Sequence, residues 1–177
     1  LPESARIHGV ISHGGVVPNI IPERSAAVFF LRSPDERQLD DMEKRFRNIV
    51  RGAALMTDTR SRITASEPFY QGRVANPALN AAYAEAAAAA GLKVEYPAVP
   101  GRGSSDFGNF SRILPGAHPY FAISEGRIPG HSPEFAEAAR SELGEENMLR
   151  AAAAMGATAL RFLTEEAFRK QVNAGGK

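Results

Sequence analysis

Residues able to do chemistry gather between Gly101 and Phe135, in the stretch GRGSSDFGNFSRILPGAHPYFAISEGRIPGHSPEF. The stretch contains two polar segments, GSSDFGN over 103–109 and GHS over 130–132, and each precedes an expected helix. The apolar segment 120–123 between them predicts a short strand. Small residues, an aspartate and a histidine on loops that flank a strand are typical of a site, because loops held by rigid elements usually carry function.

The first candidate is His131, which follows Gly130 and precedes Ser132-Pro133, the expected cap and first residue of a helix. A histidine at the mouth of a helix suits metal ligation or proton transfer. A loop histidine that only bonds a backbone carbonyl fits the same position. The residues alone leave both interpretations open.

The second candidate is the loop Gly103-Ser104-Ser105-Asp106. Asp106 and the serines can be helix-capping groups and nothing more. Alternatively, the glycine lets backbone N–H groups approach an anionic ligand. The dinucleotide fingerprint is rejected, because GRGSSD lacks the third glycine and the strand before it is poor.

Two further candidates lie earlier in the chain. Arg32 ends an apolar strand, where its planar guanidinium can bind a carboxylate with two hydrogen bonds, or serve as a surface charge. Asn19 stands between Pro18 and Ile20, where its amide can donate to a polarised carbonyl or act as a turn residue. Spacing does not decide between the two interpretations of Arg32, and for Asn19 it favours the turn residue.

Other ionisable residues carry weaker signals. His8 and His118 are interpreted as structural, and His13 stays undetermined. The pairs Glu145-Glu146 and Glu165-Glu166 stand at expected helix N-termini, where acidic side chains complement the helix dipole. The motifs H-x-D, H-E-x-x-H and G-x-S-x-G do not occur.

Composition narrows the class of protein. The chain has 177 residues, 44% of them hydrophobic, and a net charge of +1, so one ordinary domain or two small ones are expected, with neither nucleic acid nor a membrane as partner. The absence of cysteine excludes disulfides and thiolate catalysis and fits a cytoplasmic location. The start Leu1-Pro2-Glu3 has no signal-peptide character and no initiator Met, so we expect the chain to begin inside a longer protein.

The first part of the chain predicts strands at 6–12, 25–32 and 60–67. The second is almost continuously apolar, which predicts a well-covered strand. A helix is expected from Ser33, with Ser33 as its N-cap, to about Leu55. Strand, strand, helix, strand is part of an α+β sandwich.

A linker is expected over 68–74, followed by a second, mainly helical part. Asn76-Pro77 caps an alanine-rich helix that ends at Gly91, and 92–96 predicts a short strand. A long helix is expected over 145–163, and a last one after 164. The packing face of the long helix is predicted to be Leu149, Ala152, Ala153, Gly156 and Leu160.

Three blocks, in this order, carry a resemblance: IHGVISHGGVVPNIIPERSAAVFFLR, GSSDFGNFS and GHSPEFAEAA. They resemble the dizinc aminoacylase and amidohydrolase group of metallopeptidases (peptidase family M twenty), in its aminobenzoyl-glutamate hydrolase-like branch. The resemblance covers nearly the whole chain, from about Arg6 to Leu163. It implies an α/β fold in which 1–68 is part of a lid, or dimerisation, domain and 69–177 is the C-terminal part of the catalytic domain.

The resemblance also implies roles for single residues. His131 would be a metal ligand, Asn19 would hold the scissile carbonyl, and Arg32 would bind the substrate carboxylate. Gly103, Ser104 and Asp106 would line the substrate pocket. The implied cofactors are two divalent metal ions, zinc first and manganese or cobalt as alternatives. The implied partners are a small substrate with a free carboxylate and a second copy of the chain.

The family's other metal ligands are not found in this sequence, neither the H-x-D histidine nor the Glu-Glu pair. One histidine cannot hold two zinc ions. We therefore expect the C-terminal fragment of an amidohydrolase, inactive by itself. The alternative hypothesis is a non-catalytic dimerisation or ligand-binding module.

Overall fold

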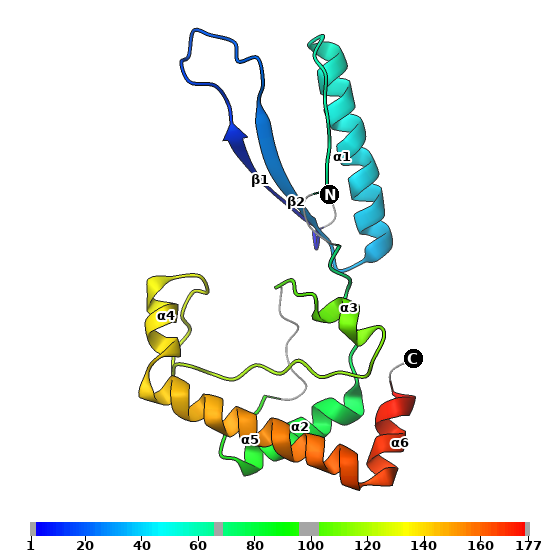
Figure 1. Cartoon of the computed structure of the whole chain (residues 1–177), viewed down its shortest axis with the longest axis vertical. Helices are drawn as coiled ribbons and strands as arrows, with labels where there is room; N and C mark the ends of the chain where they lie inside the picture. Colours follow the sequence, from blue (N-terminus) through cyan, green and yellow to red (C-terminus); the bar gives the residue numbers. More distant parts are fainter. Residues whose placement is uncertain (1–2, 66–68, 96–102, 176–177) are drawn as a thin grey trace. The chain divides into compact units, whose positions relative to one another are not determined.

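The computed structural model describes residues 3–65, 69–95 and 103–175 (Figure 1). The chain is a mixed α/β structure that divides into two compact units, Leu1–Gly72 and Arg73–Lys177. The first unit contains strands β1 (Arg6–His13) and β2 (Ala26–Arg32) and helix α1 (Glu36–Met56). The strands expected at 6–12 and 25–32 are confirmed, as is the helix that ends near Leu55.

The two strands form an antiparallel hairpin in which Gly9 pairs with Phe29 and His8 with Phe30. The Phe29 ring lies against Phe46 of α1, with ring centroids 5.1 Å apart, so this face of the hairpin faces the helix. A Cβ on Gly9 would lie 2.4 Å from the Phe29 ring. Gly9 therefore leaves the space that the aromatic ring fills beside α1.

The start of α1 differs from the prediction. Asp35, not Ser33, is the N-cap, and its carboxylate accepts a hydrogen bond from the backbone N–H of Gln38 at 3.1 Å. The Ser33 hydroxyl instead accepts from the N–H of Asp35 at 3.0 Å and donates to the Gln38 side chain at 2.6 Å. The carboxylate is a strong capping group, and it sets the helix start two residues later.

Two expectations for the first unit are wrong. Residues 60–65 form no strand, and 66–67 lie outside the described residues. The segment has only weak apolar alternation, and a strand exists only where a neighbour accepts its ladder bonds. The second strand is also not well covered, because Val28, Phe29 and Phe30 are 44–46% exposed. A continuous apolar run predicts a strand with other elements packed on both of its faces. In the described structure α1 packs on one face of β2.

The second unit is helical over its described residues. It contains α2 (Pro77–Ala89), α3 (Phe107–Ser111), α4 (Pro133–Ala139), α5 (Glu142–Thr164) and α6 (Glu166–Ala174). Helix α5 packs against α2, α4 and α6 (Figure 1). The core of the unit is a cluster of Ala82, Phe168 and Val172.

A buried asparagine joins the two ends of this unit. Asn76 is 1% exposed and caps α2 by accepting from the N–H of Leu79 at 3.1 Å. Its amide nitrogen donates to the carbonyl of Val172 in α6 at 2.8 Å. The predicted cap is confirmed, and the same side chain also satisfies a carbonyl of another helix.

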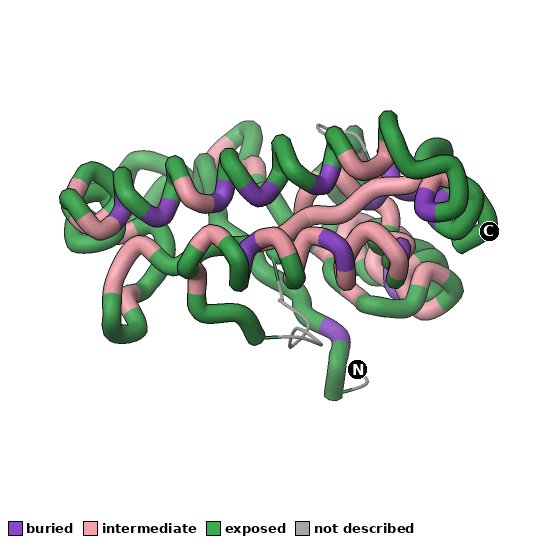
Figure 2. Tube along the Cα trace, turned by 90° about the horizontal axis from the view of Figure 1, so that it is seen from below, coloured by how far each residue is buried: buried purple, intermediate pink, exposed green. Residues whose placement is uncertain are grey.

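The packing face predicted for α5 is wrong. The buried positions are Gly144, Asn147, Ala151, Ala154 and Thr158. Leu149 and Leu160 are 66% and 62% exposed. The helix is apolar on more than one side, and the alanines at 151 and 154 let α2 approach closely, so the face with smaller side chains is buried. Figure 2 shows how few positions of the described chain are buried.

The strands expected at 92–96 and 120–123 do not form over the described residues, and residue 96 lies outside them. The N–H of Leu92 is used to end α2, donating to the carbonyl of Ala87 at 3.0 Å beside Gly91, whose φ is +85°. The carbonyl of Ala122 accepts from the Asn147 side chain at 2.9 Å. Among the described residues the sheet consists of β1 and β2 alone.

In the part of the chain that is described, no helix has the length and apolar character needed to span a bilayer.

Candidate functional site

Arg32 stands at the end of β2, on the face turned away from α1. Side chains alternate along a strand, so Phe30 and Arg32 share one face while Phe29 lies against α1. The Arg32 guanidinium carbon is 5.9 Å from the centroid of the Phe30 ring. Within residues 3–65, 69–95 and 103–175 no carboxylate pairs with it, so the planar fork is available to a ligand carboxylate.

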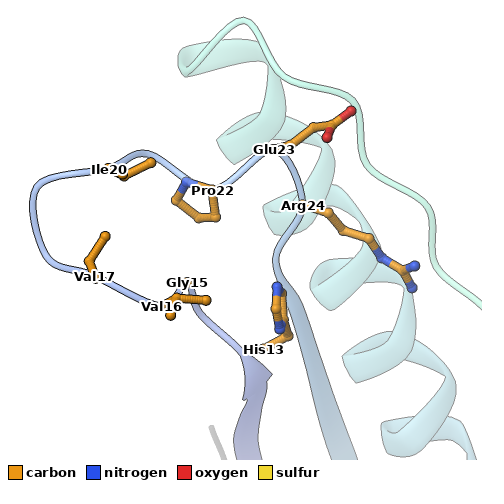
Figure 3. Close-up of a pocket in the computed structure, with 8 residues that line it drawn as sticks. All are labelled: His13, Gly15, Val16, Val17, Ile20, Pro22, Glu23 and Arg24. Carbon is orange, nitrogen blue, oxygen red and sulfur yellow. The ribbon is translucent and has the colours of Figure 1, made fainter.

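Asn19 lies in the loop between the two strands, at the third position of a turn closed by a 3.4 Å bond from the N–H of Ile20 to the carbonyl of Val17. The interpretation of Asn19 as a turn residue therefore fits the structure. Beside it is a hollow of about 340 Å³ (Figure 3), which Asn19 does not line. The lining residues are His13, Gly15, Val16, Val17, Ile20, Pro22, Glu23 and Arg24.

The hollow is shaped by the backbone of the hairpin loop. Gly15 has a φ of +111°, which favours glycine, and Pro22 lies across from it at 3.6–3.8 Å from the place of a Cβ. Val16 and Ile21 are 93% and 94% exposed. His13, undetermined by sequence, contributes its ring to the lining (Figure 3). The loop thus presents an apolar tip next to Asn19.

The loop at 103–106 leads directly into α3. The Ser105 hydroxyl caps the helix by accepting from the N–H of Phe107 at 3.1 Å, and Asp106 makes no side-chain cap bond. The capping interpretation is therefore confirmed for Ser105, whereas the Asp106 side chain occupies the N-cap position without a cap bond in the described residues. Among the described residues, apart from the chain neighbours of Gly103, no atom lies within 4 Å of the place of a Cβ on Gly103.

His131 has a φ of +60°, a left-handed conformation that is uncommon for a residue with a side chain. It is exposed, and the next residue, Ser132, caps α4 by accepting from the N–H of Phe135 at 3.2 Å. In residues 103–175 no hydrogen bond holds the His131 ring, so the alternative of a ring fixed by a backbone carbonyl is not observed. Backbone strain held at an exposed histidine is typical of functional positions.

The charge near this helix start is carried by Glu134. A hydrogen bond from its own backbone N–H lowers the pKa of the Glu134 carboxyl, so the group stays ionised to lower pH. The two glutamate pairs behave as helix groups: Glu146 pairs with Arg150 and Glu165 with Arg161.

No group of three or more His, Asp or Glu side chains that could hold a metal ion occurs among the described residues. A catalytic zinc site needs about three protein ligands. The described residues alone therefore do not fit a metal centre, and His131 is at most one ligand of such a site.

One cluster was missed by sequence reasoning. The Arg73 guanidinium lies 3.3 Å from Nδ1 of His118 and 3.4 Å from the hydroxyl of Tyr120, and the His118 ring lies 4.8 Å from that of Phe107. Arg73 and His118 are 45 positions apart, and no local pattern in the sequence connects them. The cluster stands beside the 103–106 loop.

Comparison with known proteins gives two relatives over most of the chain. An Xaa-Arg dipeptidase of Mus musculus is 36% identical over 170 residues, which cover 94% of this chain and 39% of the relative. An Xaa-Arg dipeptidase of Homo sapiens is 36% identical over 158 residues, 88% of this chain and 36% of the relative. The chain thus spans somewhat less than two fifths of the length of these relatives.

A third relative matches over a shorter stretch. One of the subunits of the p-aminobenzoyl-glutamate hydrolase of Escherichia coli (strain K12) is 34% identical over 58 residues, 32% of this chain and 12% of that protein. No protein-family model matches the chain.

Proposed function

The chain belongs to the aminoacylase and amidohydrolase group of metallopeptidases, peptidase family M twenty, and from that premise we propose that it forms part of an enzyme that hydrolyses an amide bond next to a free carboxylate. The observation that carries the proposal is the 36% identity to a dipeptidase over 94% of the chain. Members of this family use divalent metal ions. The first unit is proposed as part of the lid domain and the second as part of the catalytic domain.

The proposed substrates are dipeptides, of the Xaa-Arg type first, and N-acyl amino acids such as aminobenzoyl-glutamate. The names of the relatives support both classes. Arg32 is proposed to bind the free carboxylate, because its guanidinium is exposed at a strand end and has no carboxylate partner in the described part of the chain.

The other candidate residues are each proposed to bind either the substrate or a metal ion. Asn19 is proposed to donate its amide to the scissile carbonyl from the exposed hairpin loop. Gly103, Ser104 and Asp106 are proposed to line the pocket, which the space at Gly103 within the described residues supports. His131 is proposed as one ligand of a site for two divalent ions, zinc first, with the remaining ligands supplied by residues outside this chain. No catalytic step is assigned to the ions, because the described residues do not form their cage.

The first test compares the 177-residue chain alone with the longer polypeptide of which we propose it to be a part. Hydrolysis of Xaa-Arg dipeptides, N-acyl amino acids and aminobenzoyl-glutamate is measured with and without EDTA. We expect EDTA-sensitive hydrolysis by the longer polypeptide and none by the chain alone. EDTA-sensitive turnover by the chain alone contradicts the proposal that the remaining metal ligands lie outside this chain. If neither polypeptide hydrolyses any of the substrates, the proposed function is contradicted.

Arg32 gives a sharper test in the longer polypeptide. Arg32→Ala is expected to raise KM about 10- to 100-fold, the loss of a charge-assisted hydrogen bond. The matched control is Arg45→Ala, which removes an exposed arginine whose partner is Asp41 of the same helix. An unchanged KM in Arg32→Ala contradicts the carboxylate role.

A homodimer through the first unit is proposed as well. In the described sheet β1 and β2 each have one neighbour, so each strand presents an edge that can pair with a second copy. The same surface favours the second candidate function, a non-catalytic dimerisation module. Sedimentation equilibrium of the chain distinguishes a dimer from a monomer, and the hydrolysis assay distinguishes enzyme from module.

A further inference from the structure

A buried serine holds the end of α3, the helix that follows the proposed pocket-lining loop 103–106. Ser111, 3% exposed, closes α3, and its hydroxyl donates to the carbonyl of Gly108 at 3.0 Å. The same oxygen accepts from the backbone N–H of Val74 at 3.0 Å. Val74 lies at the start of the second unit, 37 positions away in sequence, so one hydroxyl ties α3 to that segment.

A ring stack, in which the aromatic rings are tilted against one another, holds the other end of α3. The Phe107 ring centroid lies 4.8 Å from that of His118 and 5.4 Å from that of Phe110. A Cβ on Gly116 would lie 2.7 Å from the Phe107 ring, so the ring rests directly on the backbone there. Arg73, adjacent to Val74, approaches Nδ1 of His118 at 3.3 Å.

The ring contacts act on Phe107, the residue that follows the loop, and the Ser111 hydroxyl bonds Gly108, the next residue of α3. Phe107 donates its N–H to the Ser105 hydroxyl at 3.1 Å, so the position of Phe107 fixes the last turn of the loop. On the other side, no atom of the described residues, chain neighbours apart, lies within 4 Å of the place of a Cβ on Gly103. Within the described residues, the loop is therefore held from its α3 side.

From these contacts we infer that Ser111 and His118 are positioning residues, which fix α3 and thereby hold the 103–106 loop in one conformation for substrate. The inference rests on the proposed function, which gives the loop its place in the pocket. A loop held in its binding conformation loses less conformational freedom when the substrate binds, so the expected effect falls on KM. Neither side chain is assigned contact with the reacting atoms.

Two pairs of variants distinguish the positioning role from a merely structural one. Ser111→Ala removes the hydroxyl and leaves the half-buried N–H of Val74 without it. The matched control Ser124→Ala removes an exposed hydroxyl that, in the described part of the chain, donates to nearby Gly126. His118→Ala removes the ring from Phe107, whereas His118→Phe keeps a ring in the stack. The second pair keeps the test informative if Ser111→Ala does not fold.

Two readouts are taken. Amide hydrogen exchange over 105–111 is measured in the 177-residue chain, and KM and kcat are measured in the longer polypeptide with the Xaa-Arg dipeptide. In Ser111→Ala and His118→Ala we expect exchange about tenfold faster, as for the loss of one buried contact. KM is expected to rise about tenfold with kcat within about twofold. Ser124→Ala and His118→Phe are expected to match the wild type.

The results distinguish a failure of the positioning role from a failure of the proposed function. Faster exchange with an unchanged KM overturns the positioning role and leaves the proposed function standing. Unchanged exchange in Ser111→Ala and His118→Ala shows that these side chains do not hold α3, which overturns the inference. Equal losses in His118→Ala and His118→Phe overturn the ring stack as the contact that holds this end of α3. A wild-type longer polypeptide that hydrolyses none of the substrates overturns the proposed function, and the positioning role with it.

Discussion

Phe168 in the second unit and Phe30 in the first are buried to very different extents. Phe168 in the second unit is 3% exposed, packs with Ala82 and Val172, and carries the Arg161 guanidinium 4.7 Å from its ring centroid. Phe30 in the first unit is 44% exposed and has Arg32 beside it. The second unit has a closed core, and the hairpin of the first leaves one face open.

This difference indicates where stability resides. A two-stranded hairpin is marginal by itself, and α1 covers only the Phe29 side of β1 and β2. In the second unit, helix burial and the Asn76 bonds act together. A surface that is apolar and open suits a part that closes on substrate or pairs with a second copy, which is the role proposed for the first unit.

The largest expected effect is the same substitution made in both units. Phe168→Ala should lower the unfolding free energy of the second unit by about 3–5 kcal/mol, because it leaves a cavity in a closed core. Phe30→Ala should cost roughly 1 kcal/mol or less, because nearly half of the ring is already in water. Denaturant unfolding followed by amide NMR signals of each unit measures both. Equal losses would contradict the comparison.

The next effect concerns helix caps. Asn76→Ala should cost about 2 kcal/mol, since it removes a cap and leaves the buried Val172 carbonyl without a donor. Asp35→Ala removes an exposed cap and should cost about 0.5–1 kcal/mol. The same denaturation experiment compares them. An Asp35 effect as large as that of Asn76 would show that burial does not set the difference.

Two glycines of the first unit should respond with opposite signs. Gly9→Ala should destabilise it by about 1–2 kcal/mol, because the new Cβ displaces the Phe29 ring from Phe46. In Gly52→Ala the new Cβ, outside the nearby backbone of α1, meets no atom of the described residues within 4 Å, and the change should stabilise the unit by roughly 0.5–1 kcal/mol. Thermal melting of each variant tests this. A neutral Gly9→Ala would mean that the ring does not need that space.

The smallest effect is the titration of Glu134 in the second unit. Its folded-state pKa is lowered, so its contribution to stability is present above the unfolded pKa and is lost as pH falls through the folded value. An NMR pH titration of the carboxyl carbon should give a midpoint below that of a glutamate in an unfolded peptide. A midpoint at or above the peptide value would contradict the hydrogen bond to its own N–H.

Features fixed by neighbouring residues could be predicted from the sequence. Asn76-Pro77 and Ser132-Pro133 begin helices as expected, because a cap and a first-turn proline act within three residues. The hairpin strands followed from their β-rich pattern. Among the site candidates, spacing identified Arg32 at a strand end and His131 at a helix start, and both places are observed.

Features that depend on distant partners could not be predicted. The segment 120–123 has a strand pattern, yet a strand needs a neighbour, and none pairs with it in the described part of the chain. In α5 the apolar side chains surround the helix, so periodicity selected Leu149 and Leu160 where contact with α2 buries Ala151 and Ala154. The Arg73–His118 contact bridges 45 positions and leaves no local trace.

We propose that this chain is part of a metal-dependent amidohydrolase and contributes His131 as a metal ligand. The most direct measurement is bound divalent metal, together with hydrolysis of an Xaa-Arg dipeptide, in the longer polypeptide carrying His131→Ala, with His8→Ala as the control. We predict lost metal and a rate reduced by more than about 100-fold, beyond the effect of losing a group that only supports a ligand. Unchanged metal content and unchanged hydrolysis in His131→Ala would contradict the claim.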